Sequence, residues 1–297
     1  MSEFWQYGQY IVGGLAAGSV YALMALGMIL IFKTTDIVNF AQADMTMFST
    51  FVGYAVLTGL HWPFALALPA AILAGFVLGI VTERLALRPA RNAPVISLLI
   101  TTLGVALIIN AIAGFIWGYD TKSFPYAIGG GPVILGEVRI KRQDVLTFGV
   151  ALVLSLSLFA FLKFSRIGIA MRATAQNKLA AQLMGINVHR ISAMCWGIGA
   201  AIGAVSGVLI APVISLDLNV MVSVMLKGFA AAVLGGFTSL HGALVGGVVI
   251  GVIESLLIAI PVDWVSQFRE TFVFALIILV LVVRPHGLLG EAMHRGT

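Results

Sequence analysis

The chain has 297 residues, of which 60% are hydrophobic and 10% are charged. A soluble domain carries about 25% charged residues, so this composition excludes a soluble enzyme, a disordered chain and a nucleic-acid-binding module. The formal net charge of +5 comes from 17 Lys and Arg against 12 Asp and Glu. Most basic residues stand in short loops between apolar runs, a distribution that orients a protein in a membrane.

The apolar runs predict membrane-spanning helices. A hydrocarbon core about 30 Å thick needs roughly 20 apolar residues of helix, and a helix satisfies its backbone hydrogen bonds within the run. The stretch 225–260 is too long for one span, and its glycines divide it into a short limb, 225–236, and a full span, 243–260. We predict an all-α polytopic membrane helix bundle of about nine segments, or about eight crossings if the short limb is re-entrant. The other segments are 10–32, 37–60, 63–83, 94–117, 144–163, 191–214 and 270–283.

The basic loops predict the orientation. Placing 84–91 and 163–190 in the cytoplasm puts the N-terminus and the loop 118–143 outside and the C-terminus inside. The outer loop itself carries four basic residues, which conflicts with this assignment. Its later part, 133–141, alternates apolar and polar residues and predicts a small β-hairpin. Residues 1–9 lack Lys and Arg, so we expect the first apolar run to be retained rather than cleaved as a signal peptide.

Motifs for metal, nucleotide or covalent chemistry are missing from the sequence. There is one cysteine, Cys195, and the five histidines are scattered. No sequence matches GxxxxGK[ST], so the chain has no P-loop for ATP. An intramembrane enzyme would need a catalytic set at one depth, and none is evident.

Three polar residues stand near the start of the second predicted span. Asn39 and Gln42 are three apart, so they would be neighbours on one helix face, whereas Asp44 would point elsewhere. Asn110 adds polar character to the span 94–117. Asn39, Gln42 and Asp44 form either an interhelical hydrogen-bond network or the polar lining of a transport path.

Two charged residues fall in the stretch 225–260. Glu254 lies well inside the span 243–260, where an ionisable group costs about 2.5–3.5 kcal/mol on insertion scales. It belongs either to a structural pair or to the transport path. Lys227 opens the short limb, and we expect its long side chain to reach an interface.

Glycines repeat at intervals of four along several predicted spans. Gly199, Gly203 and Gly207 fall on one helix face. Small residues at this spacing let helix backbones approach closely in a membrane, so we predict helix-packing contacts along this row. The same spacing occurs at Gly14/Gly18, Gly75/Gly79, Gly242/Gly246 and Gly247/Gly251.

The segment 165–190 is too polar for a span. We predict a short helix over 173–184, ended by Gly185. This helix would carry an apolar face, which docks either on the chain's own bundle or on a cytoplasmic partner. The candidate docking residues are Ala175, Leu179, Ala180, Ala181, Leu183, Met184 and Gly185.

Three segments resemble the bacterial inner-membrane permease of branched-chain amino acid ABC importers, in its H-type. They are "GGLAAGSVYALMALGMILIFKTTDIVNFAQADMTM" at 13–47, "RATAQNKLAAQLMGINVHRI" at 172–191, and "KGFAAAVLGGFTSLHGALVGGVVIGVIESL" at 227–256 followed by "RPHGLLG" at 284–290. The resemblance covers the whole chain in order. Two departures stand out: Ala43 replaces a usual glycine, and Lys178-Leu179 replace a usual Pro-Glu in the coupling loop.

The resemblance implies a single permease domain over 1–297 in the bacterial inner membrane. Its partners would be a second homologous permease subunit, two cytoplasmic ATPases, a periplasmic binding protein and membrane lipid. ATP and Mg would be used by the ATPases, with no cofactor in this chain. The implied cargo is leucine, isoleucine or valine, with urea, short amides or other amino acids as alternatives within the family. A stand-alone channel or secondary transporter is the alternative from another class.

Overall fold

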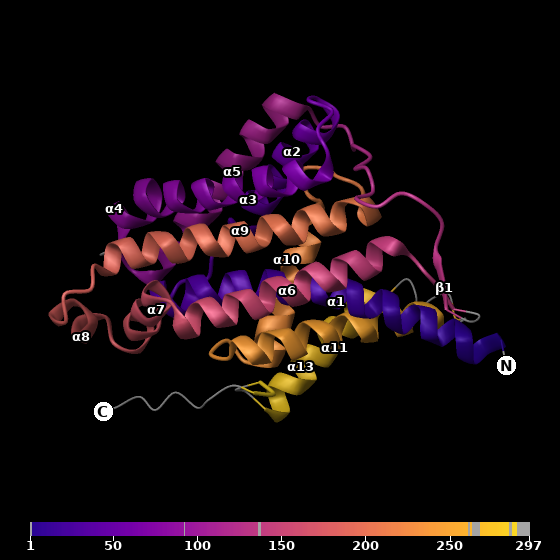
Figure 1. Ribbon diagram of the computed structural model, residues 1–297. Coiled ribbons are helices and arrows are strands. Elements are labelled where there is room, and N and C mark those ends of the chain that lie inside the picture. The colour runs from indigo at the N-terminus through magenta and orange to yellow at the C-terminus, as the bar shows by residue number, and fades with distance from the viewer. Residues whose placement is uncertain are drawn as a thin grey trace. The chain divides into compact units, whose positions relative to one another are not determined.

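The computed structural model describes residues 2–91, 93–135, 138–260, 262, 268–284 and 287–289. The predicted cytoplasmic C-terminus and part of the segment 284–290 lie outside these residues. The described chain is mainly helical (Figure 1). Its elements are α1 (Ser2–Thr35), α2 (Gln42–Thr58), α3 (Phe64–Thr82), the π-helix η1 (Glu83–Leu87), α4 (Arg88–Ala90), α5 (Val95–Trp117), β1 (Val133–Leu135), β2 (Val138–Ile140), α6 (Arg142–Phe164), α7 (Arg166–Gln176), α8 (Lys178–Leu183), α9 (Val188–Ile214), α10 (Val220–Gly235), α11 (Leu240–Ala259) and α13 (Arg269–Val283).

Every apolar segment predicted from the sequence coincides with a helix, so the prediction of an all-α membrane bundle is confirmed. Six of the described helices are long and apolar enough to cross a bilayer, and α10 is a shorter apolar helix. The short limb therefore forms a helix of its own, separated from α11 by the turn at Gly236, which has a φ of +97°. A residue in this left-handed conformation is most readily glycine.

The chain divides into two compact units. Unit 1 comprises residues 1–29, 126–152 and 226–297, and unit 2 comprises 30–125 and 153–225. Helices α1, α6 and α10 each contribute residues to both units, so neither unit is a continuous stretch of sequence.

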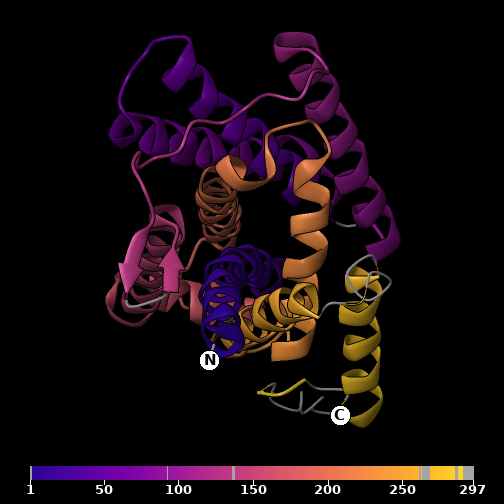
Figure 2. The ribbon, with the colours of Figure 1, turned by 90° about the vertical axis from the view of Figure 1, so that its right-hand side faces the viewer.

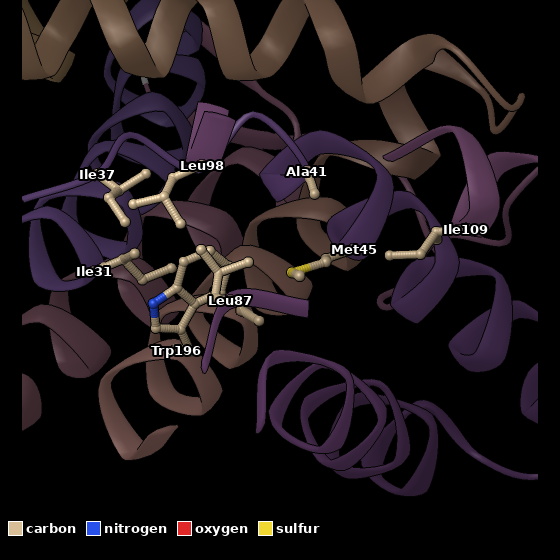
Figure 3. Packing of buried hydrophobic residues seen from close by; sticks show 9 residues of the cluster. Ile31, Ile37, Ala41, Met45, Leu87, Leu98, Ile109 and Trp196 are labelled. Atoms are coloured by element: carbon tan, nitrogen blue, oxygen red, sulfur yellow. The ribbon is translucent and has the colours of Figure 1, made fainter. Parts of the chain in front are cut away.

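Unit 2 is built around α9, with α2 and α3 packed along it. Trp196 of α9 is fully buried and lies beside Ile31 and Leu87 in the apolar core (Figure 3). Close approach of α3 depends on glycine, because a Cβ built on Gly75 would lie 2.8 Å from the carbonyl oxygen of Ala200. The core of this unit therefore contains the indole ring of Trp196, and the backbones of α3 and α9 lie almost in contact.

Unit 1 contains the close crossing of α1 and α11, which lie side by side in Figure 2. A Cβ built on Gly14 would lie 2.8 Å from Cα of Val252, and one built on Gly18 would lie 2.8 Å from Cα of Val248. A larger residue at either glycine would push the two helices apart. This is the close backbone packing that small residues permit in membranes.

The structure differs from the sequence prediction after α3. The basic segment 84–91, expected as a loop, continues the helix through η1 and α4 as far as Ala90. Pro89 is the second residue of α4, which directly follows the π-helix. The predicted hairpin at 133–141 is confirmed: β1 and β2 pair in antiparallel register, with Val133 opposite Ile140 (Figure 2).

Candidate functional site

Asn39 and Gln42 are fully buried at the entrance to α2. The side-chain amide of Asn39 donates to Oε1 of Gln42 at 3.1 Å, and its Oδ1 accepts from the backbone N–H of Ala41 at 3.0 Å. Nε2 of Gln42 in turn donates to the carbonyl oxygen of Gly199 on α9 at 3.0 Å. The two amides therefore connect the start of α2 to α9.

Asn39 lies before α2 rather than inside it, so the prediction of a helix from residue 37 is wrong at this end. Its side chain bonds the backbone two residues further on, which favours a turn over a helix. The helix begins only at Gln42, after that turn. The predicted closeness of Asn39 and Gln42 arises from this turn and not from one helix face.

Asp44 has different partners. Its Oδ1 accepts a hydrogen bond of 3.1 Å from Nδ2 of Asn110 on α5, and the same amide donates to the carbonyl oxygen of Leu218 at 3.1 Å. Asn110 thus joins α2, α5 and the segment that follows α9. In the sequence, Asn110 is a single amide in an otherwise apolar span. That pattern did not indicate its contact with Asp44.

Glu254 lies in unit 1, inside a cluster of charged and polar side chains. Its Oε1 lies 2.6 Å from Nζ of Lys227, and its Oε2 accepts a hydrogen bond of 2.8 Å from the hydroxyl of Tyr21. Lys227 also lies 3.3 Å from Glu270, and Arg269 lies 3.8 Å from Glu254. The side chain of Lys227 is only 10% exposed and is paired, and its reach to a membrane interface stays a prediction. Sequence spacing did not reveal Tyr21, which is 233 residues from Glu254.

The structure therefore joins Asn39 to Gln42, holds Asp44 through Asn110, and pairs Glu254 within unit 1. Each of these side chains has a protein partner. Their role in a transport path stays a prediction. Among the described residues, no group of three His, Cys, Asp or Glu side chains is placed to hold a metal ion.

The glycine row of α9 faces the polar side of α2. A Cβ built on Gly203 would lie 2.5 Å from Oγ1 of Thr46 and 2.6 Å from Nε2 of Gln42. Gly207 lies in the same way against Thr46 and Thr50, and Gly199 supplies the carbonyl that binds Gln42. Residues larger than glycine at Gly203 would displace the amide network directly.

The segment 165–190 forms two helices where one was predicted. Asn177 interrupts the expected helix 173–184 with an extended backbone at φ −155° and ψ 107°. It ends α7, and its Oδ1 accepts from the backbone N–H of Ala180 at 2.9 Å, so that it caps α8. Asparagine competes for backbone hydrogen bonds and favours caps over helix interiors. The prediction that Gly185 ends the helix is confirmed by its φ of +81°.

The short helix α8 presents most of its apolar side chains to solvent. Leu179, Leu183 and Met184 are 67%, 80% and 82% exposed, whereas Ala181 is only 4% exposed. The remaining three candidates, Ala175, Ala180 and Gly185, are also exposed. Ala181 therefore seats α8 within unit 2, and the leucines and Met184 form an uncovered apolar face.

The loops of unit 2 gather at the two ends of α9. At the N-terminal end of α9, Lys178 pairs with Asp36 at 2.5 Å, and Arg91 lies against His189 in the first turn of α9. Figure 1 shows α4, α7 and α8 at this end. After its last residue, the backbones of Lys122 and Leu216 exchange two hydrogen bonds of 2.7 and 2.9 Å. The two basic segments thus lie at the opposite end of unit 2 from the beginning of the loop 118–143.

Known proteins resemble this chain over nearly its whole length. Residues 10–281 match the family model described as branched-chain amino acid transport system / permease component. The chain is 32% identical to the high-affinity branched-chain amino acid transport system permease protein BraD of Pseudomonas aeruginosa over 98% of both chains. It is also 32% identical to the corresponding protein LivH of Escherichia coli K12, again over 98% of both chains.

A solved structure shows a related fold. One chain of PsaBC from Streptococcus pneumoniae, determined in complex with Fab, superposes with a TM-score of 0.50. The match covers 92% of this chain and 89% of that chain at 14% sequence identity. At this identity the likeness concerns the fold alone.

Proposed function

The chain belongs to the branched-chain amino acid transport permease family, and from this membership we propose that it is the membrane-spanning permease subunit of an ATP-driven importer. Its cargo would be leucine, isoleucine or valine, delivered by a periplasmic binding protein. The observation that carries the proposal is the 32% identity to BraD and LivH across 98% of each chain. Identity over nearly the whole length supports the same role in transport.

The exposed face of α8 supports a cytoplasmic partner. Leu183 and Met184 are more than three-quarters exposed at 80% and 82%, although both side chains are apolar. Contiguous exposed apolar groups mark interaction sites. We assign this face to an ATPase, since the sequence has no P-loop of its own. Two ATPases would then use ATP and Mg, and a second homologous permease subunit would complete the membrane part.

The exposed surface of α5 supports a membrane environment. Ile96, Leu107 and Phe115 are 70%, 73% and 92% exposed in this chain. Apolar side chains at this level of exposure suit lipid or the apolar face of a second permease subunit. We propose the inner membrane as the location, with the N-terminus outside, the C-terminus inside, and the end of unit 2 that carries α8 in the cytoplasm.

Reconstitution of the complex tests the proposal. This chain, its second permease subunit and the ATPases are placed in vesicles containing ATP, with the binding protein outside. We expect uptake of labelled leucine, isoleucine or valine, and ATP hydrolysis stimulated by the loaded binding protein. Vesicles without ATP are the control. Uptake of urea or short amides alone would reassign the cargo, and uptake by this chain without ATPases would favour a channel or secondary transporter.

A further inference from the structure

An ion pair joins the start of α8 to the end of α1. Nζ of Lys178 lies 2.5 Å from Oδ2 of Asp36, although the two residues are 142 positions apart. Lys178 is the first residue of α8, and Asp36 directly follows the last residue of α1. Both belong to unit 2. The pair is therefore a direct contact between α8 and the turn from α1 to α2.

Asp36 occupies a conformation that suits a turn residue. Its φ is +60°, and its backbone N–H donates to the carbonyl oxygen of Phe32 at 2.7 Å. Aspartate and asparagine adopt this left-handed conformation more readily than other residues with a side chain. The turn leads within three residues to Asn39, and from there to Gln42 and its bond to Gly199 on α9. A displacement of Asp36 would thus reach the amide network through a short, buried segment.

α8 is a small element with a break on each side. Asn177 separates it from α7 by an extended residue, and Gly185 ends it in a left-handed conformation. Buried Ala181 provides one contact with unit 2, and Lys178 provides a second. The leucines and Met184 stay uncovered on the outer side. α8 also packs against α7 and α9, so the ion pair is one of the contacts through which a force on that outer face would reach the rest of unit 2.

We propose that Lys178 and Asp36 are positioning residues that transmit movement of α8 to the segment 36–42 and so to the amides of Asn39 and Gln42. This inference rests on the proposed function, in which α8 receives its movement from an ATPase. Coupling would then depend on this charged contact as well as on the apolar face of α8.

A coupling role is distinguishable from a stabilising one. The side chains of Lys178 and Asp36 are 43% and 74% exposed, and ion pairs exposed to this extent contribute little to stability. Removal of the pair should therefore leave the amount of assembled complex unchanged. It should lower the number of substrate molecules taken up per ATP hydrolysed.

The test uses the reconstituted complex and four substitutions. Lys178→Gln and Asp36→Asn each remove one charge, and asparagine keeps the left-handed backbone at position 36. Lys178→Arg keeps the charge. Lys163→Gln is the matched control, since it removes one exposed positive charge from the last turn of α6 without contacting Asp36.

We expect Lys178→Gln and Asp36→Asn each to lower uptake per ATP by about two- to threefold, and the double variant to lower it no further, because the residues act through each other. Lys178→Arg and Lys163→Gln should stay near the wild-type ratio. Unchanged ratios in both single variants, or additive losses in the double variant, would overturn the inference.

A second measurement separates this inference from the proposed function. Amide hydrogen exchange of residues 37–41 is followed in the purified chain, without ATPases or substrate. Exchange should rise in Lys178→Gln and Asp36→Asn but not in Lys163→Gln, since only the first two release the turn. Equal exchange in all variants contradicts the link even if the importer is active. Failure of the wild-type complex to transport amino acids contradicts the proposed function and leaves the exchange result to decide on the link.

Discussion

Lys227 lies 2.6 Å from Glu254, and each side chain is only 10% exposed. Lys227 stands in the middle of α10, and Glu254 stands inside α11. The carboxylate also accepts a hydrogen bond from Tyr21 of α1. One ion pair with one hydrogen bond therefore joins three helices of unit 1.

The first prediction concerns this pair. Glu254→Gln leaves the ammonium of Lys227 without its main partner, and breaking a buried ion pair from one side costs about 3–5 kcal/mol. Glu270→Gln is the matched control, because Glu270 also contacts Lys227 at 3.3 Å but is 53% exposed. The measurement is thermal stability of the purified chain in detergent. We expect a large loss for Glu254→Gln and a loss within about 1 kcal/mol for Glu270→Gln.

The double variant Lys227→Met/Glu254→Leu completes this experiment. It replaces both charges by apolar groups, which is often neutral or stabilising for a buried pair. Stability restored in the double variant together with normal uptake would show that the pair serves structure alone. Restored stability without uptake would give the pair a role in transport as well.

The membrane segments were predictable because the signal for each is local. A bilayer sets the length of an apolar helix, so runs such as 94–117 and 191–214 correspond to α5 (Val95–Trp117) and α9 (Val188–Ile214) within three residues. The hairpin was predictable for the same reason, since its alternation lies within nine residues. Periodicity and length therefore determined element type and order.

The partners of the polar residues were not predictable in this way. Tyr21 and Glu254 meet across 233 positions, and Asp44 and Asn110 across 66. No local pattern records which helices become neighbours. The break at Asn177 was missed for a different reason: its neighbours favour a helix, and only the cap that its side chain makes to Ala180 reveals the interruption.

The second prediction compares two glycines in helices. Gly18→Ala would place a Cβ 2.7 Å from the carbonyl oxygen of Gly247 and force α1 away from α11. Such overpacking costs about 1–3 kcal/mol. The control is Gly104→Ala on α5, where nothing lies within 4 Å of the added Cβ. Thermal stability should fall for Gly18→Ala and stay equal or rise by up to about 1 kcal/mol for Gly104→Ala. Equal stability in the two variants would refute the close crossing.

The third prediction concerns the apolar face of α8. Leu183→Asp introduces a charge at a side chain that is 80% exposed in this chain, so the chain alone should keep its stability. Ala181→Asp instead buries a charge within unit 2 and should destabilise the chain itself. The control is Ile169→Asp on α7, which is 50% exposed. Co-purification of the ATPases and stimulation of ATP hydrolysis should fall for Leu183→Asp but not for Ile169→Asp. Normal stimulation in Leu183→Asp complexes would exclude this face as the docking surface.

The fourth prediction concerns orientation. Ser123 lies in the segment joined to Leu216, and Gln182 is exposed on α8 at the other end of α9. Single cysteines at these two positions are made in a Cys195→Ala background, since Cys195 is the one native cysteine. An impermeant thiol reagent should label position 123 in intact cells and position 182 only in inverted vesicles. Labelling of both from one side contradicts the proposed topology.

The last prediction concerns the amides at the start of α2. A zwitterionic amino acid needs a polar route past an apolar bundle, and polar groups at membrane depth must be satisfied by other helices, by water or by cargo. Gln42→Leu removes the hydrogen bond to Gly199, and Asn39→Leu removes the bonds to Gln42 and Ala41. If these amides serve the cargo, uptake should fall further than the recovery of assembled complex.

Two further variants sharpen this test. Asp44→Asn retains an oxygen that accepts from Asn110 but removes the charge, so lost uptake in this variant would reveal a role for the charge itself. Ser206→Ala is the control, because its buried hydroxyl donates a hydrogen bond of 2.6 Å to the carbonyl oxygen of Gly203 within the same helix, α9. Uptake into vesicles is normalised to complex recovered. If Asn39→Leu and Gln42→Leu assemble fully and transport at the rate of Ser206→Ala, the amides form a packing network between α2 and α9 and take no part in transport.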